Sequence, residues 1–123
     1  MSRKSAAKKS QTKTPLLLVG LPSPETDRKT SLLEANGFTV TRADTICHAE
    51  LFAAELYFDA AVYDSSVTPQ EQISLARIMR VRWPWMRLVS IGHLPPSTDH
   101  DLFDARSTTE QTLPTTLHRI LIT

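Results

Sequence analysis

The stretch DAAVYDSSV, residues 59–67, decides the fold of this chain. A short apolar run lies between two aspartates, which is typical of a parallel strand buried on both faces of a sheet. A helix start follows at once, because Thr68 is a good N-cap, Pro69 suits the first helical position and Glu71 completes a capping box. The pattern therefore predicts a strand that ends at Asp64 and leads directly into a helix.

The rest of the chain repeats this alternation of strands and helices. Further strands are predicted at residues 15–20 (PLLLVG), 38–42 (FTVTR) and 86–92 (MRLVSIG), the second of them nearer a sheet edge. Further helices are predicted after the N-cap residues Ser23 and Thr45, and a last one from the spacing of Leu113, Leu117, Ile120 and Leu121. In the helix after Thr45, the residues expected to face the core are Ala49, Phe52, Ala53 and Leu56.

This order of elements predicts an α/β fold, a three-layer sandwich in which a parallel sheet has helices on both faces. The sequence after residue 92 is polar and rich in turn formers, so a fifth strand is expected to be short or irregular. Ligands of such sheets bind at the carboxyl ends of the strands, where the strand order reverses. Gly20, Asp64 and residues 90–92 are predicted to meet at that edge.

The length, cysteine count and hydropathy predict one cytoplasmic domain. A chain of 123 residues suits a single domain, and its single cysteine, Cys47, cannot form an internal disulfide. The longest candidate membrane stretch, residues 16–21, is far shorter than the roughly 20 apolar residues that a spanning helix needs. No membrane span is therefore expected.

Residues 1–14 form a basic tail that is expected to be disordered, in front of a domain at residues 15–123. Its basic residues are Arg3, Lys4, Lys8, Lys9 and Lys13, and it contains no acid. Such a tail can bind nucleic acid or an anionic surface, because lysines near phosphates release counterions. A solubilising leader is the simpler interpretation, and the excess of acids in the rest of the chain opposes nucleic-acid binding.

Residues 15–123 resemble the receiver domain of bacterial response regulators, a flavodoxin-like (CheY-like) module that accepts a phosphoryl group on an aspartate from a histidine kinase. The resemblance is carried by LLLVG (16–20), LLEANGFTVTRAD (32–44), FDAAVYDSS (58–66) and IG (91–92). It implies that Asp64 is the candidate phosphoacceptor and that Ser90 is the candidate switch hydroxyl. Without the resemblance, Asp64 is simply the polar end of a buried strand.

Several parts of the family pattern are missing. The family has an acidic pair that holds Mg²⁺ at the end of the first strand, whereas this chain has Gly20 and Leu21 there. The family's lysine after the fifth strand has no counterpart either, since Arg106 is a poor substitute and Lys29 is the only lysine outside the tail. We therefore expect a degenerate or pseudo-receiver, with no cofactor and with Mg²⁺ only if Asp64 is phosphorylated.

The predicted function is a stand-alone receiver-like signalling module that acts by protein–protein interaction without standard phosphorylation. Its partner would be another signalling protein, such as a histidine kinase or an output protein; the oligomeric state is left open. Residues 82–87 (RWPWMR) lie at the sheet edge opposite Asp64 and form either a hydrophobic plug or an interface. The candidate interface residues are Arg77, Arg80, Trp83, Trp85 and Arg87.

Two alternative functions stay open, a phosphorelay receiver phosphorylated on Asp64 and a nucleic-acid accessory protein that uses the tail. An enzyme is not predicted, because no glycine-rich phosphate loop, nucleophile elbow or pair of acids at strand ends is present. The histidines lack the spacing of paired metal ligands, and residues 99–101 (DHD) beside His93 suit a solvated loop better than a metal site. No metal site is predicted.

Overall fold

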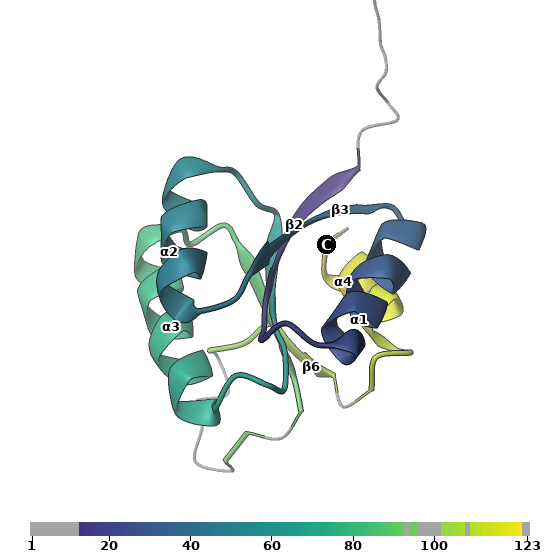
Figure 1. Cartoon of the computed structure of the whole chain (residues 1–123). Coiled ribbons are helices and arrows are strands. Elements are labelled where there is room, and N and C mark those ends of the chain that lie inside the picture. Colours follow the sequence, from purple (N-terminus) through teal and green to yellow (C-terminus); the bar gives the residue numbers. More distant parts are fainter. Residues whose placement is uncertain (1–12, 93, 96–101, 108, 122–123) are drawn as a thin grey trace, which may run out of the picture.

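The computed structural model describes residues 13–92, 94–95, 102–107 and 109–121 (Figure 1). Of the tail's basic residues, Arg3, Lys4, Lys8 and Lys9 lie outside these ranges, and Lys13 is exposed. The expected disorder of the tail therefore stays a prediction. Within the described ranges, no helix is long and apolar enough to cross a membrane.

Five parallel strands form one sheet in the order β3-β2-β4-β5-β6. The strands are β2 (Thr14–Val19), β3 (Phe38–Ala43), β4 (Ala60–Tyr63), β5 (Arg87–Ile91) and β6 (Ala105–Ser107). The chain passes from β2 outward to the edge strand β3 and then crosses back to β4, so the strand order reverses between β2 and β4. The predicted parallel sheet, the edge position of the second strand and the short fifth strand are confirmed.

In the part of the chain that the structure describes, four helices cover the two faces of the sheet, with α2 and α3 on one side and α1 and α4 on the other (Figure 1). They are α1 (Pro24–Ala35), α2 (Ile46–Glu55), α3 (Pro69–Arg82) and α4 (Leu113–Leu121). The side chains of Ser23, Thr45 and Thr68 each accept a hydrogen bond from a backbone amide of the first turn, as predicted. The three-layer α/β sandwich is confirmed.

The central strands β2, β4 and β5 are buried on both faces, so successive residues of each strand pack into two separate cores. Leu17 and Val19 of β2 pack under α2 and α3, while Leu16 and Leu18 pack under α1 and α4. Leu56 was expected in the first core but is 51% exposed, and this prediction is wrong. Leu56 caps α2 in an extended conformation, which takes its side chain off the helical stripe.

The described residues of the connection from β5 to β6, which are 92, 94–95 and 102–104, form no helix. Leu102 and Phe103 are buried there instead, and the ring of Phe103 meets that of Tyr63 edge-on at 5.7 Å. Asp104 fixes this segment to the sheet, since one carboxylate oxygen accepts hydrogen bonds from Leu88 N at 2.8 Å and Arg80 Nη2 at 3.0 Å. Leu102 and Phe103 thus complete the core on this side of α3.

Candidate functional site

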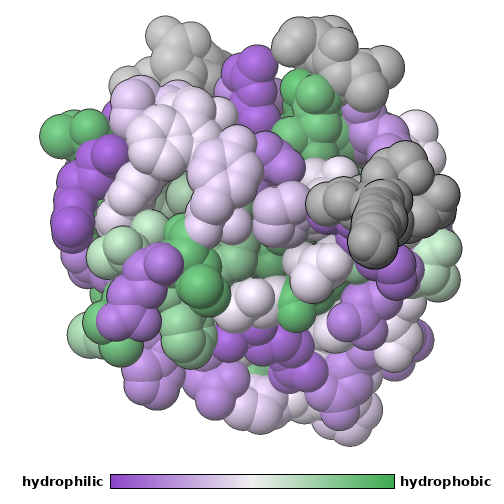
Figure 2. Space-filling model, turned by 90° about the horizontal axis from the view of Figure 1, so that it is seen from above, coloured by the Kyte–Doolittle hydropathy of each residue, from purple (hydrophilic) through white to green (hydrophobic). Residues whose placement is uncertain are grey.

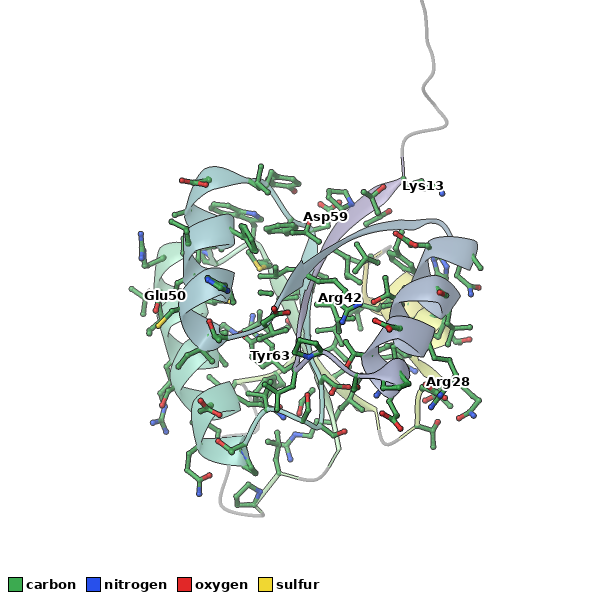
Figure 3. The ribbon with its side chains drawn as sticks, in the orientation of Figure 1. Lys13, Arg28, Arg42, Glu50, Asp59 and Tyr63 are labelled. Atoms are coloured by element: carbon green, nitrogen blue, oxygen red, sulfur yellow. The ribbon has the colours of Figure 1, made fainter. Side chains whose placement is uncertain are left out.

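Asp64 lies directly after β4, at the edge where the strands end and beside the reversal in strand order. In Figure 3, Asp59 marks the beginning of β4 and Tyr63 its end, so this edge is the lower one in that view. The backbone amide of Asp64 donates to Val19 O of the neighbouring strand at 2.8 Å. The sheet therefore holds Asp64 where the sequence predicts it, but the residue is only 2% exposed.

The two carboxylate oxygens of Asp64 have different partners, Oδ1 in an ion pair and Oδ2 in two hydrogen bonds. Lys29 Nζ lies 2.7 Å from Oδ1, and the two side chains are 9% and 3% exposed. Ser66 donates to Oδ2 twice, from its backbone amide at 3.0 Å and from its hydroxyl at 2.5 Å. The candidate phosphoacceptor is thus one half of a buried ion pair.

Lys29 reaches this position because it lies on the buried face of α1. Thr26, Lys29 and Leu33 are the buried residues of the helix, and their spacing places them on one stripe. Lysine is almost never fully buried unless its ammonium is paired. A lone lysine on the inward stripe of a helix is a signal that can be found in the sequence, but the sequence does not reveal that Lys29 pairs with Asp64.

Gly20 lies directly against Asp64, at the position where the receiver family has the first residue of its acidic pair. A Cβ at this position would lie 2.7 Å from Asp64 Cβ and 3.3 Å from its carboxyl carbon. Leu21, the second position of the pair, has a 52% exposed side chain and donates its backbone amide to Ser66 Oγ at 3.0 Å. The chain therefore uses a close approach of β2 to Asp64 where the family would place metal ligands.

Ser90, the candidate switch hydroxyl, is fully buried on the α3 side of the sheet. Its hydroxyl donates to Gln72 Oε1 at 2.6 Å, and Gln72 Nε2 donates to the backbone oxygens of Val67 at 3.0 Å and Asp64 at 3.2 Å. Ser90 is thus linked to the Asp64 backbone through Gln72. The structure places its hydroxyl in a structural network rather than on the Asp64 carboxylate.

A cavity of about 210 Å³ opens at the same edge of the sheet, beside the Asp64 site. Its lining residues are Leu21, Asp44, Thr45, Ile46, Ser66, Val67, Thr68 and Glu71. Asp64 is not among them, because Ser66 lies between the cavity and the carboxylate. The described residues contain no group of three metal-ligating side chains, and the cluster of His93 and residues 99–101 lies outside them.

The candidate interface residues divide into partnered and exposed groups. Arg80, one of the candidate interface residues, turns toward the segment before β6 and donates to Leu102 O at 2.9 Å. Arg87 Nη1 lies 3.5 Å from Asp104 Oδ1, whereas Arg77 is exposed. Arg106, the poor substitute for the family's lysine, is also exposed.

The two tryptophans behave differently at the opposite edge of the sheet. Trp83 is half-buried and packs against the core, as a plug would, whereas Trp85 is 52% exposed and stacks on Tyr57 with ring centroids 6.3 Å apart. Figure 2 looks onto this edge, where apolar and weakly polar side chains cover much of the middle. Of the two tryptophans, Trp85 is therefore the one that contributes a large exposed surface.

The ionisation of Asp64 should be visible in the pH dependence of stability. Burial opposes the charged form, but Lys29 and the two hydrogen bonds from Ser66 outweigh it and hold the pKa of Asp64 below its ordinary value. A lowered pKa in the folded state stabilises the fold above the unfolded pKa of about 3.9, and this contribution is lost as the pH falls below it. We expect the difference in unfolding free energy between wild type and Asp64→Asn to be constant above about pH 5 and to shrink below about pH 4.

Urea denaturation at a series of pH values measures this difference. Asp27→Asn is the matched control, because Asp27 is exposed and pairs with Arg42 at the surface. A difference between wild type and Asp64→Asn that does not change between pH 5 and pH 3 would contradict the expectation.

Comparison with known proteins finds the same fold among solved structures but no match to the sequence among protein families or curated proteins. No protein-family model and no curated protein matches the sequence. Among solved structures, a CheY-like response regulator receiver domain protein from Methanospirillum hungatei superposes with a TM-score of 0.77 at 17% identity, covering 89% of this chain and 94% of that chain.

Two further structures are similar. An orphan response regulator from H. pylori gives a TM-score of 0.74 at 12% identity, covering 89% of this chain and 98% of that chain. The receiver domain of an HD domain-containing protein from Pseudomonas fluorescens gives 0.73 at 17% identity, with 89% and 95% covered. The fold is therefore that of CheY-like receiver domains, as the resemblance in the sequence implied.

Proposed function

We propose that this chain is a receiver-like signalling module of the response-regulator type that acts by contact with another signalling protein, without phosphorylation of Asp64. The observation that carries the proposal is the buried ion pair between Lys29 Nζ and Asp64 Oδ1, at 2.7 Å. The partner is a signalling protein, such as a kinase or an output protein, and the expected compartment is the cytoplasm.

The chemistry of phosphoryl transfer supports this proposal. A phosphoryl group and a carboxylate are both anionic, and the reaction needs a cation that neutralises the charge developing between them, together with an in-line approach to the oxygen. Here the ammonium of Lys29 already covers Oδ1, and Ser66 covers Oδ2. A donor would have to displace these groups from a side chain that is 3% exposed.

The positions at which a receiver domain would switch between two conformations, Gly20 and Ser90, are also unavailable for binding a metal or a phosphoryl group. A ligand shifts a conformational equilibrium only through contacts that differ between the states. Gly20 has no space for a metal-binding side chain, and the hydroxyl of Ser90 is bonded to Gln72. We therefore propose that the module has one conformation and that its surface binds the partner protein.

Thermal melts with and without Mg²⁺ plus beryllofluoride, an acyl-phosphate mimic, test the proposal. A ligand at 100 times its Kd stabilises the native state by about 2.7 kcal/mol, which corresponds to a rise of roughly 10 °C for a domain of this size. We expect no resolvable rise in wild type or in Asp64→Ala. A Mg²⁺-dependent receiver melted in the same solutions verifies the reagent.

The same melt decides the alternative of a phosphorelay receiver. A rise in the melting temperature of wild type that is absent in Asp64→Ala would make Asp64 a phosphoacceptor and overturn the proposal. Equal rises in both proteins would indicate ion binding elsewhere and would leave Asp64 without a phosphoryl-binding role.

A further inference from the structure

The outer face of α3 carries a shallow apolar hollow between two arginines. Its volume is about 360 Å³, and it is lined by Arg77, Ile78, Val81 and Arg82. Val81 is 81% exposed, more than the other large apolar side chains among the described residues. An apolar surface with a charged rim is the usual composition of a small docking site.

The hollow is a consequence of how α3 packs. The helix buries Gln72, Leu75, Ala76 and Met79 toward the sheet, so the hollow lies on the remaining stripe of the helix. One end of it is fixed, because Arg82 Cζ lies 4.6 Å from the centre of the Trp83 ring. Arg82 Nη1 also lies 3.6 Å from Glu50 Oε2 of α2, which runs beside α3 (Figure 1).

The hollow has a positive rim, and one of its arginines, Arg77, has no acidic partner among the described residues. Arg80 and Arg87 are engaged by Asp104 on other sides of the structure. Arg77 is exposed and forms no ion pair with any residue that the structure describes. A cation beside an open apolar floor is complementary to an apolar side chain flanked by carboxylates.

We infer that this hollow, defined by Arg77, Ile78, Val81 and Arg82, docks an acidic amphipathic segment of a partner protein. Its size suits one or two large apolar side chains of a helix laid along α3, with acids meeting Arg77. A second copy of the chain fits less well, because a two-fold interface would place the arginines of this face against one another. The inference rests on the proposed function only in that a module acting by contact needs a docking face.

A defined peptide tests the inference. The probe is a fluorescein-labelled helical peptide with leucine at i, i+3, i+4 and i+7 and glutamate on its flanks, and the comparison peptide has lysine in place of each glutamate. Anisotropy titrations give the affinities, and amide chemical shifts locate the binding. We expect the acidic peptide to bind with shifts centred on α3, and the basic peptide not to bind.

Charge-reversed variants supply the matched comparison. Arg77→Glu and Arg119→Glu make the same charge change at exposed positions, the first at the hollow and the second on α4 across the sheet. We expect Arg77→Glu and Val81→Glu to weaken binding about tenfold or more, and Arg119→Glu to change it less than about twofold. Thermal melts confirm that each variant is folded.

Three outcomes would overturn the docking site: no binding of the acidic peptide to wild type, equal weakening by Arg77→Glu and Arg119→Glu, or equal binding of both peptides. None of them bears on the Asp64 site. A beryllofluoride response combined with peptide binding at α3 would overturn the proposed function and leave the docking site in place.

Discussion

Replacing Lys29 with methionine is expected to lower the free energy of unfolding by about 3–5 kcal/mol. The change removes the ammonium that lies 2.7 Å from Asp64 Oδ1 and leaves a carboxylate that is 3% exposed without its counter-ion. Ser66 would still donate to Oδ2, but two hydrogen bonds do not replace the lost positive charge. The loss is a large fraction of the 5–15 kcal/mol that is typical of a domain.

Urea denaturation followed by circular dichroism measures this loss. Lys13→Met is the control, because Lys13 is exposed and the same substitution there should change stability by less than about 0.5 kcal/mol. If the single variant does not fold, the double variant Lys29→Met/Asp64→Leu still tests the cause, since replacing both members of a buried pair by apolar groups is often neutral or stabilising. A loss below about 1 kcal/mol in Lys29→Met would contradict the structure.

Replacing Gly20 with alanine is expected to cost about 1–3 kcal/mol, and replacing it with aspartate still more. The new Cβ would lie 2.7 Å from Asp64 Cβ, so β2 and β4, two neighbouring buried strands, would have to move apart. Aspartate would also add a second carboxylate beside Asp64, where Lys29 supplies one ammonium. Restoring an acid at the family's metal position should therefore destabilise the fold rather than create a Mg²⁺ site.

Gly37→Ala separates packing from backbone effects in the same denaturation experiment. Gly37 has a φ of +96° with open space around its Cβ position, so alanine there is strained but meets no atom. The expected cost is about 1–2 kcal/mol from the backbone conformation. An alanine at Gly20 that leaves stability unchanged, or an aspartate there that makes the melting temperature rise with Mg²⁺, would show that the site is less closed than the structure indicates.

The fold was predictable because its signals are local. Caps and first-turn prolines such as Thr68 and Pro69 mark helix starts within a few residues, and a continuous apolar run such as residues 60–63 marks a strand covered on both faces. The short β6 also followed from composition, since the stretch before it is polar and turn-rich.

The burial of Asp64 against Lys29 and Gly20 was not predictable, because it depends on contacts between distant parts of the chain. Lys29 is charged, and a lysine is expected at the surface unless its partner is known. The need for glycine at position 20 arises only when Asp64 packs against it. Arg80 likewise turns inward because it donates hydrogen bonds to Leu102 O and Asp104 Oδ2. The spacing of residues along α3 does not reveal these distant partners.

The pairing of Lys29 with Asp64 has a consequence for how a cell could control this module. Under the proposed function, the ion pair with Lys29 keeps Asp64 from accepting a phosphoryl group from a kinase or a small phosphodonor, and the module would be insulated from cross-talk with neighbouring pathways. Its output would then follow its abundance. The cell would control the activity of the module through the rates of its synthesis and degradation. The signal would then be the amount of protein and not its covalent modification.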